Sequence, residues 1–180
     1  MLAQISAFLD EHARSPHLDE TERGHVHRCQ ALLQQGDAAF CRHQLAPGHF
    51  TASAFVLSPC KTELLLIRHR KLNRWLQPGG HFEPTDASLE AAIRREVSEE
   101  VGLTDMTSPN KRLFDVDVHA IPTSTKQEAH EHFDLRMLFH ARTREIQAGS
   151  DAESARWEAF EGIKHLESDL SVLRAVARLR

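Results

Sequence analysis

Residues 75–103, WLQPGGHFEPTDASLEAAIRREVSEEVGL, contain the pattern that decides the fold of this chain. Apolar side chains recur in the second half of this segment at three- and four-residue spacing, which is typical of an amphipathic helix with one face in a core. We expect the helix to span residues 86–101 and to end at Gly102. Its predicted buried positions are Leu89, Ala92, Ile93, Val97 and Val101.

Three carboxylates share one face of this predicted helix. Glu96, Glu99 and Glu100 stand at positions i, i+3 and i+4, so their side chains emerge close together. Like charges at this spacing repel one another, and a hard divalent cation such as Mg²⁺ would offset that repulsion through oxygen ligands. Glu-rich helix faces are also common as solvated surfaces, and both interpretations stay open on the helix alone.

The surroundings of these carboxylates resemble the Nudix box. In that family's pattern a glycine is followed after five residues by glutamate, and after seven more by Arg-Glu, an apolar residue, any residue, Glu-Glu, any residue, glycine and an apolar residue. Residues 95–103 match the second half of this pattern in full, after a Pro-Gly-Gly turn at residues 78–80.

The first half of the pattern departs from the family. The family has thirteen residues between its glycine and its arginine, whereas residues 81–94 of this chain are fourteen. At the position that helps to fix the helix and its arginine in the family, the resemblance therefore places Asp86 or Ala87 instead of a glutamate, depending on where the extra residue falls. We favour Asp86.

The resemblance implies a metal-dependent hydrolase of diphosphate linkages. Its metal ligands would be the carbonyl of Gly80 and the carboxylates of Glu96, Glu99 and Glu100, holding Mg²⁺ with Mn²⁺ as a possible substitute. Arg95 would orient a glutamate through a bidentate pair. Glu99 is our hypothesis for the general base. A further carboxylate downstream of the box is common in the family, and Glu128 and Glu131 are the rival candidates here.

Composition places the chain among ordinary globular proteins. It has 180 residues, 41% hydrophobic and 27% charged, which suits one domain with an extension. The formal net charge of −4 argues against a surface that coats nucleic acid. Three widely spaced cysteines without a CxxC pair indicate free thiols in a reducing compartment. With no apolar run long enough for a signal peptide or a membrane span, we expect a cytoplasmic protein.

Residues 1–44 form a predicted N-terminal helical extension, and residues 45–180 form the predicted Nudix domain. An apolar stripe including Ile5 and Leu9 marks a first helix, and Asp19 caps a second one that Gly36 closes. The several histidines of the extension fit no standard zinc spacing, so we expect them to be solvated. The extension is a lid, a contact of a homodimer or a structural brace, and the sequence leaves these three roles open.

Two β-leaning runs follow, at residues 50–57 and 63–68, joined by turn residues as a hairpin. The basic loop at residues 68–74 then leads into the box. We expect one or two of its cations, Arg70 in particular, to contact substrate phosphates, with a solvated loop as the alternative.

Two strands with alternating polarity are predicted after the box, at residues 111–121 and 130–141. Each has an apolar face and a polar face, and the polar faces together could form a surface that binds substrate. The alternative is a half-exposed antiparallel sheet. The polar side chains in question are Asp117, His119, His132, Asp134 and Arg136.

A strand at residues 155–160 and a helix at residues 163–179 complete the predicted elements, with Leu166, Leu170, Leu173, Val176 and Ala177 facing inward. Their order fits an α/β fold, the α/β/α sandwich with a mixed sheet that the Nudix resemblance implies. The expected partner is a small-molecule diphosphate of the nucleoside diphosphate type or a related metabolite. The main alternative is a catalytically inactive Nudix-fold module that binds a ligand or regulates. Isomerisation of isopentenyl diphosphate on the same fold would need a cysteine near the box, and no cysteine is close to it in sequence.

Overall fold

The computed structural model describes residues 1–70, 72–123, 125, 127–149 and 152–179. Lys71 of the predicted basic loop lies outside these residues. The chain divides into two compact units. Unit 1 comprises Met1–Ala52, Gly80–Ala92 and Arg112–Arg136, and unit 2 comprises Ser53–Gly79, Ile93–Lys111 and Met137–Arg180.

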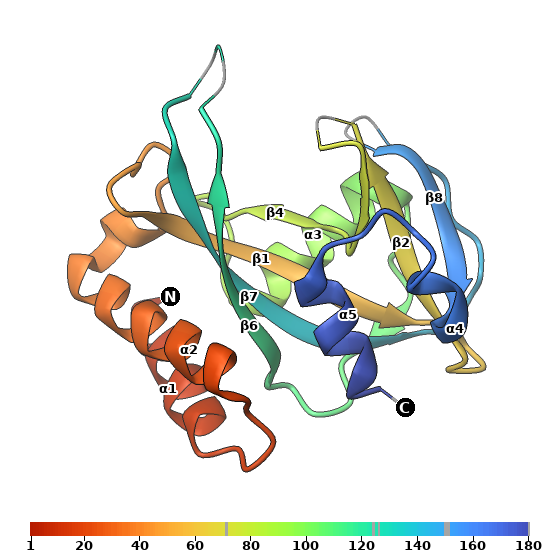
Figure 1. Cartoon of the computed structure of the whole chain (residues 1–180), viewed down its shortest axis with the longest axis horizontal. Coiled ribbons are helices and arrows are strands. Elements are labelled where there is room, and N and C mark those ends of the chain that lie inside the picture. The colour runs from red at the N-terminus through yellow and green to blue at the C-terminus, as the bar shows by residue number, and fades with distance from the viewer. Residues whose placement is uncertain (71, 124, 126, 150–151, 180) are drawn as a thin grey trace. The chain divides into compact units, whose positions relative to one another are not determined.

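The predicted N-terminal helices are present in unit 1. Helix α1 spans Leu2–Ala13 and helix α2 spans Glu20–Leu32, and a 3₁₀ segment, η1, follows at Leu33–Phe40. The two α-helices lie side by side and both contact strand β6, Leu113–Ile121 (Figure 1). The extension therefore packs on the sheet of its own unit.

The start of α2 is as the sequence predicts, whereas α2 ends at Leu32, four residues before the predicted end at Gly36. The side chain of Asp19 accepts a hydrogen bond of 2.7 Å from the backbone N–H of Glu22, which satisfies a donor at the start of the helix. Gly36 adopts a left-handed conformation with φ of 65° within η1, a conformation that costs glycine little.

The expectation that all histidines of the extension are solvated is wrong for His12. Its side chain is buried, and its Nε2 lies 2.8 Å from Oε1 of Glu22, which is fully buried. The same carboxylate oxygen accepts a 3.1 Å hydrogen bond from the backbone N–H of Val116. The pair thus joins α1, α2 and β6, and a buried carboxylate is tolerated because it has these donors.

The strands of unit 1 are the N-terminal part of β1 (Gly48–Leu57), β6, and the N-terminal part of β7 (His130–Ala141), with β4 (Gly79–His81) entering at Gly80. Strand β6 pairs with β7, and β4 pairs with β1. Phe50 is fully buried, and its ring lies 5.2 Å from that of Phe40 and 6.2 Å from that of Phe133. These aromatic contacts form part of the apolar core of the unit.

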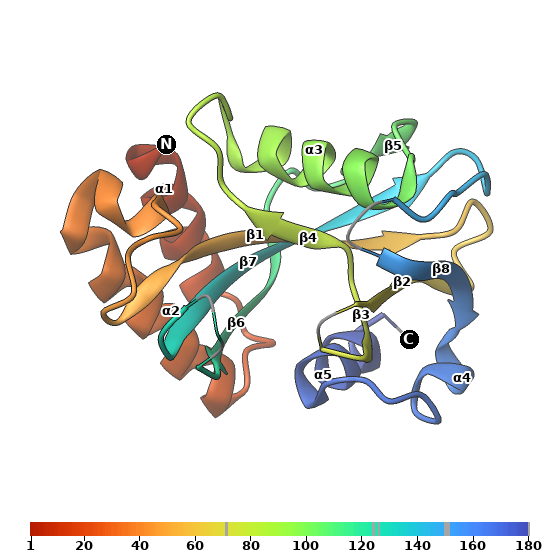
Figure 2. The same ribbon diagram turned by 90° about the horizontal axis from the view of Figure 1, so that it is seen from above.

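Strand β2, Glu63–His69, is the centre of unit 2. It pairs antiparallel with β1 through Leu57 and Leu64, which confirms the predicted hairpin. It also pairs antiparallel with β3, Arg74–Leu76, and with β8, Ala152–Ala159, which runs beside it in both views (Figures 1 and 2). The short strand β5, Met106–Thr107, pairs with the C-terminal part of β7.

Two predicted helix boundaries are wrong. The box helix, α3, spans Leu89–Val101 and so begins three residues later than expected. Its first turn is capped by Ser88, whose Oγ accepts from the N–H of Ala91 at 3.1 Å, while Asp86 accepts from the N–H of Glu83 in the preceding turn. Asp86 therefore stabilises the loop before the helix.

The long C-terminal helix is also divided. The structure has α4 at Phe160–Ile163 and α5 at Leu170–Ala177, with a separate segment between them. Leu170, predicted to face inward, is 83% exposed, and Ala177 is exposed as well. The buried side of α5 consists of Val172, Ala175 and Val176.

The α/β class, the mixed sheet and the N-terminal helices are confirmed, with strands paired in the order β3-β2-β1-β7-β5. All three cysteines are free thiols, with Cys29 buried and Cys41 and Cys60 exposed. Within the part of the chain that the structure describes, no helix has the length and apolar character needed to cross a membrane.

Candidate active site

The C-terminal part of α3, in unit 2, carries the three predicted carboxylates. Its apolar positions Ile93, Val97 and Val101 are fully buried, which fixes the rotation of the helix. The carboxylates of this face differ in environment: the side chain of Glu99 is 56% exposed and that of Glu96 is 14% exposed, while Glu100 as a residue is 6% exposed. The carboxylates of this face therefore range from the largely solvated Glu99 to the buried Glu100.

Arg95 connects two of these carboxylates. Its Nη1 donates to Oε1 of Glu96 at 2.8 Å and lies 3.4 Å from Oε2 of Glu99. Nη1 of Arg95 thus contacts both Glu96 and Glu99, which reduces the repulsion between these two carboxylates. The predicted bidentate pair through which Arg95 would orient one glutamate stays a prediction.

Glu100 is held by the backbone of the Pro-Gly-Gly turn. Its Oε2 accepts a 2.8 Å hydrogen bond from the N–H of Gly79. A buried carboxylate that accepts a backbone N–H is stabilised in position, because leaving either group without its partner would be costly. The turn and the helix of the box are thereby joined within unit 2.

A segment of the C-terminal part of the chain covers the end of α3. The N–H of Gly149 donates to the carbonyl of Glu100 at 2.7 Å, and that of Gln147 donates to the carbonyl of Val101 at 2.9 Å. A Cβ at position 149 would lie 1.9 Å from the carbonyl oxygen of Glu99, so only glycine permits this approach. These bonds satisfy carbonyls that a helix end leaves without an intrahelical partner.

The remaining predicted site residues lie elsewhere in the chain. Arg70, in unit 2, is exposed and has its Nη2 3.5 Å from the carbonyl oxygen of Ala152. Gly80 lies in β4 and is counted with unit 1, and its role as a metal ligand stays a prediction. The other predicted residues all belong to unit 1: His119, Glu128, Glu131, His132 and Arg136.

Arg136 does not lie on an open substrate surface. It is 2% exposed, and its guanidinium contacts the carboxylates of Asp134 at 2.7 Å, Asp115 at 2.9 Å and Asp117 at 3.3 Å. Burial opposes its charge, but these three carboxylates outweigh burial and raise the pKa of Arg136 above its ordinary value. Arg136 is the centre of a buried ion cluster, and its predicted substrate-binding role stays a prediction.

The candidate downstream carboxylates make contacts within unit 1. Glu131 forms an ion pair with Arg28 of α2, and its side chain is 30% exposed. Glu128 is exposed, and its backbone carbonyl accepts a 2.8 Å hydrogen bond from Nδ1 of His130. A catalytic role for either glutamate stays a prediction.

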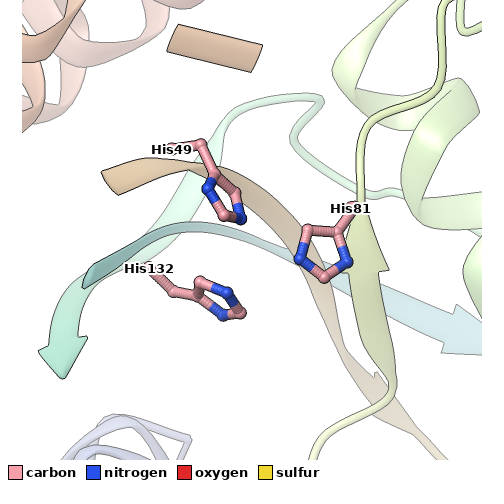
Figure 3. A group of neighbouring side chains, drawn as sticks. All are labelled: His49, His81 and His132. Atoms are coloured by element: carbon pink, nitrogen blue, oxygen red, sulfur yellow. The ribbon is translucent and has the colours of Figure 1, made fainter. Parts of the chain in front are cut away.

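Unit 1 contains a group of histidines that the sequence does not predict. His49, His81 and His132 each place one ring nitrogen within 4.8 Å of the other two (Figure 3). Only His132 was singled out from sequence, as a substrate-binding residue. The period-two spacing of His49 and Thr51 in β1, and of His132 and Asp134 in β7, was the available signal, because residues two apart share a strand face. Indeed Thr51 donates to Asp134 at 3.0 Å, one step along that face from the histidines.

Comparisons of the sequence find a family model and a known protein that are similar to this chain. A model of the NUDIX domain family matches residues 48–177. A probable DHNTP pyrophosphohydrolase from Lactococcus lactis is 35% identical over 99 residues, which are 54% of this chain. The matched stretch spans only 57% of that relative's own length.

Solved structures share the fold at low sequence identity. A NUDIX-family hydrolase from Clostridium perfringens is 24% identical with a TM-score of 0.55, covering 77% of this chain and 97% of its own. The dihydroneopterin triphosphate pyrophosphohydrolase of E. coli is 13% identical with a TM-score of 0.55, covering 72% and 92%. The NUDIX domain of Shewanella oneidensis NrtR, complexed with ADP ribose, is 14% identical with a TM-score of 0.56, covering 72% and 84%. The family match, the box residues on α3 and the shared fold together establish that this chain belongs to the NUDIX domain family.

Proposed function

We propose that this protein is a Mg²⁺-dependent pyrophosphohydrolase that cleaves a diphosphate linkage in a nucleoside diphosphate-type or related metabolite. The observation that carries the proposal is the arrangement on α3, where Arg95 bridges Glu96 and Glu99 while Glu100 is held by Gly79. A helix face of this kind concentrates carboxylate oxygens and restrains them at the same time.

The donor set fits a hard divalent cation. Glu96, Glu99 and Glu100 offer only oxygen atoms, which Mg²⁺ and Mn²⁺ prefer to nitrogen or sulfur. When bound, the cation supplies charge neutralisation for the phosphoryl oxygens of the substrate.

The differing environments of the carboxylates suggest their roles. Glu99 is the most exposed of the three, so it can reach water and accept its proton as the general base. Arg95 restrains Glu99 without burying it. Glu100, held by a backbone donor, acts as the fixed ligand, which limits reorganisation when substrate binds.

The substrate class is a phosphorylated small molecule. The names of two similar proteins, a pyrophosphohydrolase from Lactococcus lactis and one from E. coli, both refer to dihydroneopterin triphosphate, which makes pterin and nucleoside triphosphates suitable first candidates. The free cysteines agree with the cytoplasmic location that we propose for this reaction.

The test is a screen of purified protein against diphosphate-containing metabolites with Mg²⁺ or Mn²⁺, measuring released phosphate or pyrophosphate. The panel includes nucleoside triphosphates, dihydroneopterin triphosphate and ADP ribose. We expect turnover of at least one compound that stops when EDTA is added. Binding of ADP ribose without turnover of any compound would instead support the inactive ligand-binding module; ADP ribose is on the panel because the similar NrtR domain is complexed with it.

A further inference from the structure

Three histidines from distant parts of the chain meet in unit 1. His49 lies in β1, His81 in β4 and His132 in β7, and both β4 and β7 are neighbours of β1. One nitrogen from each ring lies within 4.8 Å of the other two, and Figure 3 shows the rings grouped around a shared space. Their ring centroids are separated by 4.9 to 5.1 Å.

His49 has a nitrogen that can accept a ligand. The residue is fully buried, and its Nδ1 lies 2.9 Å from the carbonyl oxygen of Gln44. A carbonyl only accepts, so the proton of the neutral ring is on Nδ1 and Nε2 carries a lone pair. This Nε2 has no hydrogen-bond partner among the residues that the structure describes. A buried acceptor without a partner is costly, and a ligand would remove that cost.

The contacts of His132 also indicate which of its ring nitrogens carries a lone pair. Nδ1 of His130 donates to the carbonyl of Glu128 at 2.8 Å, so Nε2 of a neutral His130 is an acceptor. Nε2 of His132 lies 3.3 Å from it and serves as the donor, which leaves a lone pair on Nδ1 of His132. Backbone carbonyls at Gln44 and Glu128 thereby set the tautomers, as outer partners do for metal-binding histidines.

The rings are also held in the form that binds metals. Burial, followed by repulsion from the neighbouring histidines, lowers the pKa of His132 to about 2, and burial lowers that of His49. The neighbours that disfavour a proton on His132 are His81, His119, His49 and His130.

We propose that His49, His81 and His132 form a binding site for a divalent transition-metal ion of the Zn²⁺ class. Imidazole nitrogen suits Zn²⁺, whereas the Mg²⁺ of the proposed reaction prefers oxygen, so the two ions call for different residues of this chain. Tetrahedral Zn²⁺ with Zn–N distances of about 2.05 Å needs nitrogens about 3.4 Å apart. Ring nitrogens within 4.8 Å of one another reach that geometry when each moves inward by less than about 1 Å.

Three protein ligands leave the fourth position of a tetrahedral ion open for water or a further ligand. Metal binding by these histidines is separate from the proposed hydrolysis, so either proposal can be correct when the other is wrong. The competing explanation is that the three rings are neutral packing groups that bind no ion.

The experiment uses the full-length, tag-free protein, freed of metal with EDTA and then titrated with Zn²⁺ by calorimetry and with Co²⁺ by visible absorption. We expect one ion per chain, an intense tetrahedral Co²⁺ spectrum, and a Tm that rises with Zn²⁺. The single variants His49→Gln, His81→Gln and His132→Gln should each weaken Zn²⁺ binding by more than the roughly 10–100-fold that loss of an outer partner costs. His130→Gln should fall within that 10–100-fold range, because it positions His132 without binding the ion.

Two variants serve as controls. His27→Gln removes an exposed histidine of α2, and Glu99→Gln removes a carboxylate of α3, and both should retain the Zn²⁺ affinity and the Co²⁺ spectrum. If wild-type protein binds neither ion, the histidines are packing groups and the proposal is wrong. It is equally wrong if binding survives the histidine substitutions but is lost in Glu99→Gln. Where a histidine variant fails to fold, the wild-type Co²⁺ spectrum decides, since octahedral oxygen ligation gives only weak bands.

Discussion

The backbone N–H of Gly79 donates to Oε2 of Glu100 at 2.8 Å, so the turn and the helix of the Nudix box share a direct hydrogen bond. Glu100 is 6% exposed, while the side chain of Glu99, one residue earlier, is 56% exposed. Two adjacent carboxylates of the same motif therefore differ in environment: Glu100 is buried and bound to the turn, whereas Glu99 is largely exposed to solvent.

This difference predicts unequal effects on stability. Glu100→Ala leaves the N–H of Gly79 without this acceptor and should lower the free energy of unfolding by about 1–3 kcal/mol. Glu99→Ala should change it by no more than about 0.5 kcal/mol, as for most surface substitutions. Urea denaturation followed by circular dichroism measures both. Glu100→Gln, which keeps an acceptor oxygen, is the matched control, and equal destabilisation by the two alanine variants would contradict this account.

Gly149 should tolerate no side chain. Its Cβ would lie 1.9 Å from the carbonyl oxygen of Glu99, so Gly149→Ala must displace the segment that binds the end of α3. We expect a loss of stability above about 1 kcal/mol and reduced hydrolytic activity. Gly24→Ala in α2 is the control, because nothing lies within 4 Å of its Cβ and alanine favours a helix by about 0.5–1 kcal/mol. Thermal melts of the two variants should shift in opposite directions.

Arg136 should be indispensable for folding. Arg136→Met leaves Asp115, Asp117 and Asp134 buried without their shared cation, and removal of one partner from such a cluster costs about 3–5 kcal/mol. Arg142→Met provides the comparison, since Arg142 and Asp105 are 66% and 65% exposed and such pairs contribute about 1 kcal/mol at most. Denaturation midpoints that fall equally in both variants would rule out the buried cluster as a major source of stability.

Cys60 and Cys29 should differ in their reactivity toward an alkylating reagent. Hydrogen bonds from Ser58, followed by those from Thr62, lower the pKa of Cys60 to about 7, so its thiolate predominates above that pH. Alkylation of Cys60 by iodoacetamide, followed by mass spectrometry, should reach half its maximal rate near pH 7, and Ser58→Ala should move this midpoint upward. Burial, followed by repulsion from Asp134, raises the pKa of Cys29, which should stay unlabelled in the native protein. A Cys60 midpoint near the ordinary value of about 8.5 would refute the assignment.

The sequence predicted best where the determinants are local. The cap of α2 by Asp19, the end of α3 at Gly102 and the hairpin joining β1 and β2 depend on residues a few positions apart, and all three are found. The pattern Arg-Glu…Glu-Glu identified the family for the same reason, because its chemistry lies on two turns of one helix.

Elements that depend on distant partners were missed. Strand β5 is two residues long and exists because Met106 pairs with Ala141, and β3 exists because Leu76 pairs with Ile67. No local propensity marks such short strands. The C-terminal helix was predicted as one piece because its apolar spacing continues through Leu170, a residue that the structure leaves exposed.

The polar faces of β6 and β7 show a second limit of sequence reasoning. Alternation at Asp117 and Asp134 predicts a half-exposed or substrate-binding face, but both carboxylates are buried, together with Asp115, around Arg136. Period-two spacing reveals that residues share a face, and only the tertiary structure reveals what covers that face. The three-histidine group was hidden for a related reason, since its members come from three separate strands.

The most direct measurement for the central proposal compares wild-type protein with the double variant Glu99→Gln, Glu100→Gln. Phosphate or pyrophosphate release is measured with Mg²⁺ on the best compound of the diphosphate panel, and circular dichroism verifies that the variant is folded. We predict that the double variant loses at least about 100-fold in rate while its fold is retained, because a general base and a fixed ligand are both removed. A folded double variant that hydrolyses the same compound at the wild-type rate would contradict the assignment of the α3 carboxylates.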